Sequence, residues 1–393
     1  MTENTRHDFD AGGPETFDSA HEEYARLRAQ CPVAHSTDLG GFWGLMRYDD
    51  VKRAASDAET FITSKQNVVP KIAFTGRRPP LHLDPPDHTP YRRALNMVFT
   101  KERAEALVPF TRNSARELLA PMLAKGGGDI CAEFASFLPV YVFGEWARMP
   151  AQWLHTLHEA GRAFILAVHN FDQESMKATS LRLYEIARDF IALRQREPGD
   201  PNDDPVSALL AARHQGEPLP PELVVGCVRQ VLVVGIVAPT VMMGSISVHL
   251  SRDPELQDRL RTHSELLPDA IEEFLRLYTP YRGFARTATH DVTFGDVTIR
   301  TDEAIALVYA SANRDESVFP QGDEFIMCRP NIGEHLAFGR GPHNCPGLHI
   351  GRMELRVALE ELLASTKQFS VVGEIGMTRW PEIGALTVPL QFD

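Results

Sequence analysis

The fold of this chain is decided by residues 335–363, HLAFGRGPHNCPGLHIGRMELRVALEELL, where a glycine-rich turn precedes Cys345 and an amphipathic helix is predicted to follow it. Cys345 thus lies at the entrance to a helix. The free amides and the positive end of the helix dipole favour a thiolate there, so we expect a lowered pKa and a sulfur that can bind a metal. Gly339, Gly341 and Gly347 allow the backbone to turn tightly and to approach a flat ligand.

Composition indicates an ordinary globular protein with a large core. Of the 393 residues, 43% are hydrophobic and 24% charged, as in typical folded proteins. The net charge of -13 argues against a nucleic-acid partner, which requires a concentrated basic surface. The five cysteines are odd in number and contain no CxxC pair, which favours a reducing, cytoplasmic location over a disulfide framework.

The chain shows no internal repeat and no long linker, so we expect a single domain over residues 15–393. Residues 1–14 are polar and lack the basic and apolar regions of a signal peptide. They are predicted to form a flexible N-terminal tail. The most apolar stretch, Val231–Ile246, is shorter than the roughly 20 residues of a membrane span and contains Gly235 and Pro239. It is therefore interpreted as a buried core helix, and no membrane partner is expected.

Periodicity predicts a mainly α fold with small β-sheets. Residues 221–250 are apolar nearly all round, which predicts a buried rod of roughly 40 Å that Pro239 should kink or open near Gly235. Apolar residues recur at helical spacing in 101–124, 179–195 and 354–363, and β-like segments occur at 42–48, 291–300 and 303–310.

The spacing of residues around the cysteine resembles the haem-binding signature of the cytochrome P450 superfamily. The matching positions are Phe338, Gly339, Gly341, His343, Cys345 and Gly347. The resemblance implies the fold of that family, with haem b held between the long central helix and the cysteine loop. Cys345 would be the axial iron ligand, donating electron density that favours O–O cleavage. Phe338 would pack beside the sulfur, and His343 would reach a haem propionate.

Three simpler interpretations of Cys345 remain open at this point. A buried free cysteine in a loop is common. A zinc site could use His343, Cys345 and His349, although no fourth ligand lies at structural spacing. A cysteine nucleophile could use His343 as its base, but a base two residues away in a tight loop is poorly aimed.

Further matches to the family lie elsewhere in the chain. Glu273 and Arg276 form an ExxR pair on one helix face, which in the family is buried and locked to an arginine of the later meander, here Arg329. Alone, such a pair is usually a solvated surface contact. The stretch ASANRDE at 310–316 also matches the pattern that precedes the meander.

The resemblance also supplies candidate propionate ligands. His88 and Arg92 are four residues apart on one helical face, in a segment resembling the family's helix at the haem edge. Arg286 matches a propionate-binding arginine of bacterial members of the family. A guanidinium group suits this role because it forms charge-assisted bonds to buried carboxylates. Without the cysteine signature, each of these residues would be interpreted as a solvated basic residue.

The central helix departs from the family pattern. Most members carry a glycine followed two and three residues later by an acid and a threonine, which help to deliver protons to iron-bound dioxygen. Aligned on Gly235, the acid and threonine positions here are Val237 and Ala238. Thr240 lies two residues on, about 200° around an ideal helix. Protons would then arrive through ordered water or a substrate group, or the enzyme would use peroxide.

Electrons must come from another protein or domain, because the chain contains no GxGxxG fingerprint, P-loop or ferredoxin-type cysteine set. We expect a ferredoxin or a flavin/iron–sulfur reductase, either separate or fused at the C-terminus. The apolar central segment resembles the haem domains of self-sufficient, reductase-fused members and of thiocarbamate-degrading enzymes. Arg340 and Arg352 are candidates for attracting an acidic donor.

The sequence therefore predicts a haem-thiolate monooxygenase that inserts one oxygen atom from O₂ into a small apolar or aromatic molecule, by hydroxylation or oxidative O- or N-dealkylation. A peroxide-driven peroxygenase and a non-catalytic haem sensor are the alternatives. With Val237 and Ala238, the residues expected to line the substrate side are Val69, Phe74, Leu166, Val233, Phe284 and Leu386.

Overall fold

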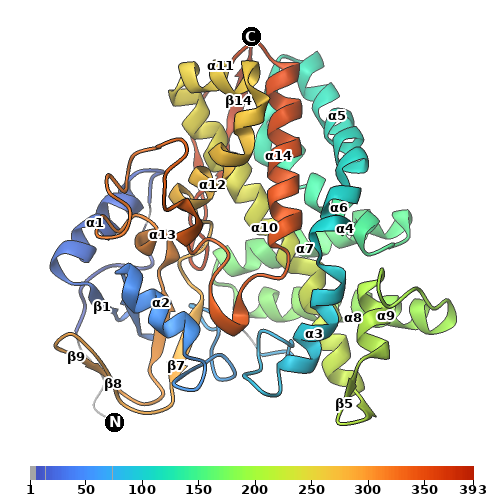
Figure 1. The fold of residues 1–393 in the computed structure, drawn as a ribbon, viewed down its shortest axis with the longest axis vertical. Helices are drawn as coiled ribbons and strands as arrows, with labels where there is room; N and C mark the ends of the chain where they lie inside the picture. The colour runs from blue at the N-terminus through green and yellow to red at the C-terminus, as the bar shows by residue number, and fades with distance from the viewer. Residues whose placement is uncertain (1–5, 14, 73) are drawn as a thin grey trace.

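The computed structural model describes residues 6–13, 15–72 and 74–393, and it is mainly helical with small β-sheets (Figure 1). The helices are α1 (Ser19–Gln30), α2 (Tyr48–Ser56), α3 (Thr89–Val98), α4 (Lys101–Ala106), α5 (Val108–Ala124), α6 (Leu138–Trp146), α7 (Leu154–His169), α8 (Gln173–Arg196), α9 (Pro205–Ala211), α10 (Pro221–Arg252), α11 (Pro254–Thr262), α12 (Leu267–Leu277), α13 (Tyr309–Ala312) and α14 (Leu348–Ser365).

The largest sheet has the strand order β1-β2-β10-β7-β3, and only its β2–β10 pair is parallel. Its strands are β1 (Val33–Ser36), β2 (Phe42–Leu45), β3 (Phe61–Ile62), β7 (Ala285–Ala288) and β10 (Ala304–Leu307). A second sheet has the order β11-β14-β4, with strands β4 (Gly127–Asp129), β11 (Phe369–Val371) and β14 (Pro389–Phe392). Three pairs complete the set: β5 (Arg213–His214) with β6 (Glu217–Pro218), β8 (Val292–Phe294) with β9 (Val297–Ile299), and β12 (Gly376–Met377) with β13 (Ala385–Thr387).

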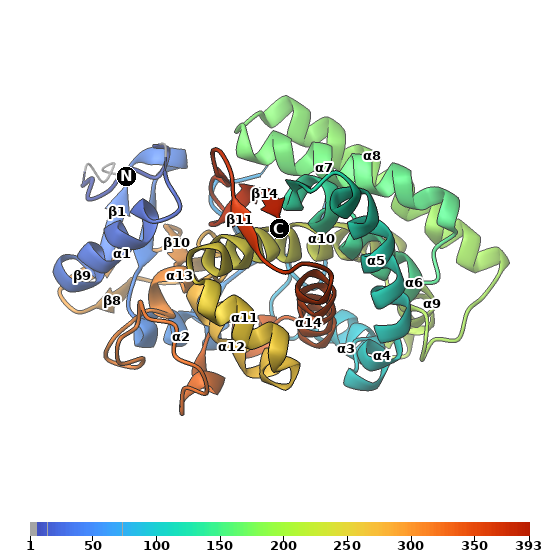
Figure 2. The ribbon, with the colours of Figure 1, turned by 90° about the horizontal axis from the view of Figure 1, so that it is seen from above.

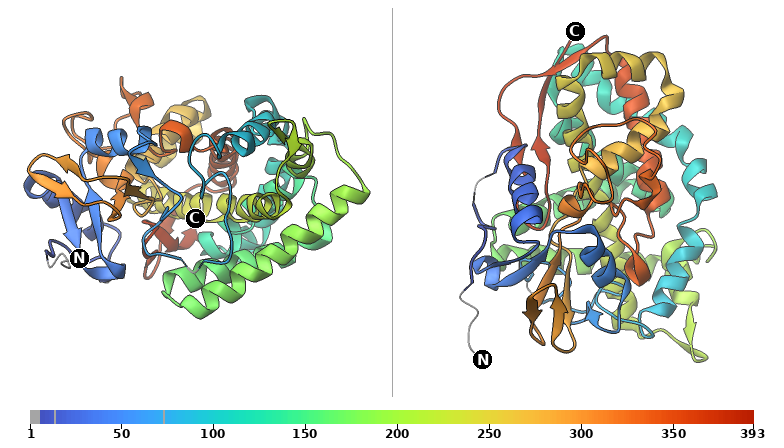
Figure 3. Two further views of the ribbon diagram at one scale, coloured as in Figure 1. Left: turned by 90° about the horizontal axis from the view of Figure 1, so that it is seen from below. Right: turned by 60° about the vertical axis from the view of Figure 1, so that its left-hand side comes forward.

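Helix α10 is the centre of the molecule. It crosses the middle with α7 and α8 on one side and α11, α12 and α14 on the other (Figure 2), and α7 and α8, in green, run along one outer edge (Figure 3). Among the described residues it is the only helix long and apolar enough to cross a membrane, but 76% of its most apolar stretch is buried inside the protein. It is therefore a core helix.

Pro239 does not interrupt α10, so the predicted opening near Gly235 is wrong, whereas the alternative of a kink stays a prediction. The helix is continuous from Pro221 to Arg252, although a proline cannot donate the backbone hydrogen bond of its turn. Packing against α6, α8, α14 and β13 surrounds the helix. Such tertiary packing supplies most of a helix's stability in a protein and outweighs one missing bond.

The other predicted elements lie near their expected places. The helix expected over 101–124 is divided at Leu107 into α4 and α5, while 179–195 lies within α8 and 354–363 within α14. The segment 291–300 forms the β8–β9 hairpin, and 303–310 contains β10.

The N-terminal segment is partly packed. Of the predicted tail over residues 1–14, residues 1–5 and 14 lie outside the described residues. Within 6–13, Phe9 is 5% exposed and its ring contacts those of Phe42 and Trp380, and the Asp8 amide donates to the His35 carbonyl. This part is therefore not a free tail, because Phe9 buries its ring in the core.

Candidate functional site

The loop before α14 holds Cys345 by backbone contacts. The Cys345 amide donates to the Phe338 carbonyl at 2.8 Å, which closes the turn. Gly341 has φ +72°, and a Cβ there would lie 2.5 Å from the Ala55 carbonyl oxygen, so only glycine fits this position. Gly347 has φ −83°, which any residue can adopt. Its conformation therefore does not require glycine.

Burial decides the ionisation of the free Cys345 thiol. Loss of hydration raises its pKa, while the Gly347 amide and the positive charges of Arg92 and Arg352 oppose this rise without cancelling it. The predicted lowering of the pKa is therefore wrong for the free thiol, because desolvation exceeds the effect of the helix entrance. Coordination to a metal cation would replace the proton and stabilise the thiolate.

Four basic side chains, from α3, β7 and the loop itself, meet here. His88 immediately precedes α3 and its Nε2 lies 3.2 Å from the Pro342 carbonyl oxygen. Arg92, one turn further along α3, donates through Nη1 to the Asn344 carbonyl. The imidazole rings of His88 and His343 lie 5.1 Å apart between centroids. The helix α3 is thus attached directly to the cysteine loop.

Arg286 completes this basic cluster from strand β7. It is 3% exposed, and its side chain forms one hydrogen bond, to the Ala285 carbonyl at 2.9 Å. Burial lowers its pKa, and burial together with the charge of Arg286 lowers the pKa of His343 to about 3. A neutral imidazole retains one N–H donor.

None of His88, Arg92, Arg286 and His343 forms an ion pair in the described part of the chain, and the one carboxylate that acts on this cluster, Asp84, already accepts the Thr63 and Ser64 amides. Buried charges are normally paired. A cofactor that carries two carboxylates, such as haem with its propionates, would supply the missing charge. This donor set next to a cysteine therefore fits haem.

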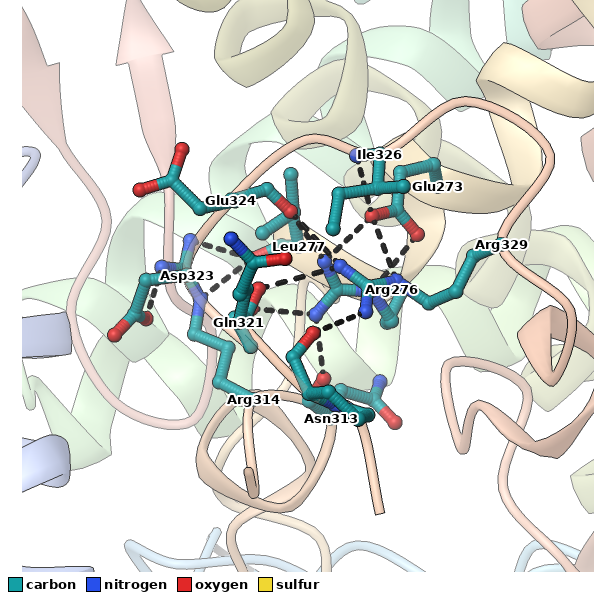
Figure 4. Close-up of polar contacts among 12 residues, drawn as sticks. Glu273, Arg276, Leu277, Asn313, Arg314, Gln321, Asp323, Glu324, Ile326 and Arg329 are labelled. Carbon is teal, nitrogen blue, oxygen red and sulfur yellow. Dashed lines mark hydrogen bonds and ion pairs between the residues drawn. The ribbon is translucent and has the colours of Figure 1, made fainter. Parts of the chain in front are cut away.

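The ExxR pair lies in a buried network that joins α12 to the meander before the cysteine loop (Figure 4). Arg276 donates to Glu273 through Nε at 2.8 Å and Nη2 at 2.7 Å, and Arg329 donates through Nε at 3.1 Å. All three residues are at most 4% exposed. Although burial favours the neutral acid, the bonds from Arg276, the Ile326 amide and Arg329 hold the pKa of Glu273 below its usual value.

The two arginines also hold the meander backbone. Arg276 donates to the carbonyls of Asn313, Gly322 and Glu324, and Arg329 donates to those of Pro320, Gln321 and Glu324. One carboxylate thus orients two guanidinium groups, which satisfy carbonyls of an irregular segment that has no strand partner. The network fixes the segment that leads into the cysteine loop.

The zinc and nucleophile interpretations of Cys345 find no support in the geometry. Among the described residues, the only group of three or more His, Cys, Asp or Glu side chains close enough to share a metal ion is His7, Asp10 and Asp38 at the surface. His343 lies against His88 and Thr63, with its Nε2 3.4 Å from Thr63 Oγ1. It is therefore engaged away from the sulfur.

Comparisons with known proteins agree with this geometry. Residues 172–372 match the family model described as cytochrome P450. The chain is 33% identical to cytochrome P450 130 of Mycobacterium tuberculosis, over 94% of both chains, and 34% identical to the mycinamicin IV hydroxylase/epoxidase of Micromonospora griseorubida, over 94% of this chain and 93% of that one. The solved structure of cytochrome P450 CYP109Q5 from Chondromyces apiculatus superposes with a TM-score of 0.87 at 27% identity, covering 98% of each chain.

The chain belongs to the cytochrome P450 family. It has the P450 fold and is a P450 monooxygenase, an oxidoreductase whose family uses haem iron, O₂, an organic substrate and a redox partner. The likeness to reductase-fused and thiocarbamate-degrading members stays a prediction.

The centre of α10 offers this P450 no acid or alcohol at the usual positions. Val237 is 6% exposed and Ala238 is half-buried, and a Cβ built on Gly235 would meet no atom within 4 Å. The Thr240 hydroxyl lies 2.9 Å from the Ala135 carbonyl oxygen and 2.8 Å from that of Ile236. Its single proton is therefore used within the protein framework.

The expected substrate-lining residues are only partly brought together. The Val69 amide donates to the Gly283 carbonyl at 2.8 Å, which places Val69 next to Phe284. Val233 is buried on α10, and Leu386 lies on β13, which packs against α10. In contrast, Phe74 is 73% exposed and Leu166 is 44% exposed.

A second ion-pair network lies near the loop and was not predicted from the sequence. Arg352 donates to Glu272 through Nε at 2.6 Å and Nη2 at 2.7 Å, and His335 Nε2 lies 3.0 Å from the same carboxylate. These bonds outweigh burial and lower the pKa of Glu272 to about 2. The Glu272 carboxylate thus neutralises the charge of Arg352. Arg352 is therefore not an isolated cation that could attract an acidic electron donor. The adjacent EE at 272–273 was the signal available in the sequence.

Proposed function

We propose that this P450 inserts one oxygen atom from O₂ into a small apolar or aromatic molecule, by hydroxylation or oxidative O- or N-dealkylation. Residues 15–393 would act as one haem b domain in the cytoplasm. The observation that carries the proposal is the position of Cys345 at the entrance to α14, beside a basic cluster whose members form no ion pair with a carboxylate in the described part of the chain. Haem supplies the activation of dioxygen, and the protein supplies binding and orientation.

Each residue of the site then has a defined task. Cys345 would bind the iron as a thiolate, with Phe338 and Gly347 beside it. Arg286 and Arg92 would bind the two propionates, and His88 and His343 would donate further hydrogen bonds. Arginine suits this task because its planar fork matches a carboxylate.

The substrate side would be apolar. Val69, Val233, Val237, Ala238 and Phe284 come from three segments, and Leu386 comes from β13. Such walls exclude water and favour apolar groups through burial of their surface. Phe74 and Leu166 are exposed to solvent, so they are not part of this proposed wall in the present conformation.

We propose that a ferredoxin or flavin/iron–sulfur reductase delivers electrons at the surface of α3. An open groove there is lined by Thr89, Arg92, Arg93, Asn96 and Met97. Arg92 also bonds to the cysteine loop, so the groove lies next to the proposed iron ligand. A cationic groove with an exposed methionine suits an acidic partner. Arg93→Glu should slow reduction by a ferredoxin while leaving haem content unchanged, and an unchanged rate would exclude this surface.

The absorption spectrum of the reduced protein with carbon monoxide tests the central assignment. A strongly red-shifted Soret band is expected in wild type and in the control Cys328→Ala, which alters an exposed cysteine, but not in Cys345→Ala. Incorporation of labelled oxygen from O₂ into product tests the reaction class. A wild-type band that survives in Cys345→Ala would refute the ligand assignment.

A peroxygenase is the second candidate, and one observation favours it. Neither an acid nor a free hydroxyl occupies the usual proton-delivery positions of α10, because Thr240 is bonded to the backbone. Hydrogen peroxide brings its own protons and electrons. Product formation with peroxide alone, at rates exceeding those with O₂ and a reductase, would establish this alternative.

A further inference from the structure

Two arginines outside the cysteine loop site are buried without an anion. Arg78 is 7% exposed and Arg229, on α10, is fully buried. Within the described residues neither forms an ion pair, and the Nε atoms of both are buried without a hydrogen-bond partner. A buried, unpaired charge is strongly unfavourable. Two such groups, close enough for the charge of Arg78 to lower the pKa of Arg229, therefore need an explanation.

The protein contacts of these guanidinium groups are weak. Arg229 donates through Nη2 to Ser180 Oγ at 3.1 Å and lies 4.6 Å from the Phe164 ring centroid. The Arg78 side chain forms no hydrogen bond with another described residue. A hydroxyl and an aromatic face stabilise a cation only in part, so most of the donors in this pair remain available.

The surroundings add positive character and no negative charge. Burial lowers the pKa of Arg78 to about 10, and burial followed by the charge of Arg78 lowers the pKa of Arg229. Burial and the charges of Arg78, Arg229 and, least, Arg77 lower the pKa of His82 to about 3, and its Nε2 also lacks a hydrogen-bond partner. Only the Tyr184 hydroxyl raises the pKa of both arginines.

The loop that carries Arg78 is fitted against two helices. A Cβ on Gly226 of α10 would lie 1.9 Å from the Arg77 carbonyl oxygen, so the loop can approach α10 only at a glycine. Gly76 has φ +145°, and a Cβ there would lie 2.7 Å from Tyr184 Oη of α8. Both glycines are required for the docking that brings Arg78 to Arg229.

Arg229 lies at one end of a side of α10 that runs to Val237. Arg229, Val233 and Val237 occupy positions i, i+4 and i+8 of this helix, which follow one another along one side. The buried Oε1 of Gln230, next to Arg229, also has no hydrogen-bond partner. From Arg229 to Val237 the helix rises by about 12 Å.

We propose that Arg78 and Arg229 bind the carboxylate of an elongated, otherwise apolar substrate, whose other end extends along this side of α10 toward Val237 and the proposed haem. The inference rests on the proposed function and narrows its substrate class to organic acids. Two guanidinium groups match the two oxygens of a carboxylate, and the length of this side sets the separation between the carboxylate and the oxidised carbon.

Spectral titration of the haem with matched acids and esters tests the proposal. The probes are decanoic, phenylhexanoic and pentylbenzoic acids, each with its methyl ester, against wild type, Arg78→Gln, Arg229→Gln and Arg77→Gln. Arg77 is the exposed neighbour and serves as the control. At least one acid should bind more tightly than its ester in wild type and Arg77→Gln, and should lose about 10- to 100-fold in affinity in the other two variants.

Two titration results would overturn the proposal. One is that no acid binds more tightly than its ester in wild type. The other is that the preference for an acid survives in the Arg78→Gln/Arg229→Gln double variant. Both results count only if the wild type shows the red-shifted Soret band of a haem bound by thiolate. A wild type without that band would instead contradict the proposed function.

A measurement without ligand tests the same site independently of haem chemistry. If Arg78 is an uncompensated cation held for a ligand, Arg78→Met should raise the thermal midpoint, by about 1–3 °C for each kcal/mol gained. A lowered midpoint would show that Arg78 is structural and would overturn the proposal. Arg229 is not used here because it bonds to Ser180 and contacts Phe164.

Discussion

Replacing Glu273 by glutamine tests whether the buried network before the cysteine loop is held by charge. Glu273 accepts four hydrogen bonds, from Nε and Nη2 of Arg276, from Nε of Arg329 and from the Ile326 amide. A glutamine offers one acceptor oxygen and turns an NH₂ group toward guanidinium donors. Two cations that are at most 4% exposed would then lose their counter-charge.

We expect Glu273→Gln to lower the free energy of unfolding by about 3–5 kcal/mol, the cost of breaking a buried ion pair. The chain supplies a matched control in Glu23, which also pairs with an arginine three residues on, Arg26, through bonds of 2.8 Å and 2.6 Å. That pair is 39–43% exposed, so Glu23→Gln should cost under about 1 kcal/mol.

Urea unfolding followed by circular dichroism measures both losses, provided that the dependence on urea is unchanged between variants. Haem content should fall in Glu273→Gln alone, because the meander leads into the cysteine loop. Equal, small losses in the two variants would refute the claim that burial makes the Glu273 charge important.

Three further outcomes follow from individual residues. Burial raises the pKa of Glu354 to about 8, so the native state keeps a proton that the unfolded chain releases above about pH 4.5. The free energy of unfolding should therefore fall by up to about 1.4 kcal/mol per pH unit toward pH 8. Glu354→Gln should reduce this fall between unfolding curves measured at pH 5 and pH 8, and an unchanged pH dependence would contradict the assignment. Gly341→Ala should cost about 1–3 kcal/mol and reduce haem retention, whereas Gly333→Ala, with no atom within 4 Å of its Cβ, should change neither. Thr240→Val should cost about 1 kcal/mol without changing the ratio of product to electrons consumed, because its hydroxyl is already bonded; a lower ratio would assign it to proton delivery.

The sequence alone determined the family and the general fold. The spacing of glycines, His343 and Cys345 depends on local backbone geometry, which is encoded in adjacent residues. Helices α8 and α14 were predicted because their apolar residues recur at helical spacing. Periodicity is a local property and survives without knowledge of the neighbours.

Tertiary structure decided what depends on distant partners. The continuity of α10 through Pro239 and the raised pKa of the Cys345 thiol both result from burial, which no local pattern measures. Arg78 and Arg229 stand 151 positions apart in the sequence, and as isolated residues they would be interpreted as solvated surface arginines. Only the folded chain buries them together without an anion, because burial and charge pairing depend on all the elements that pack around a side chain.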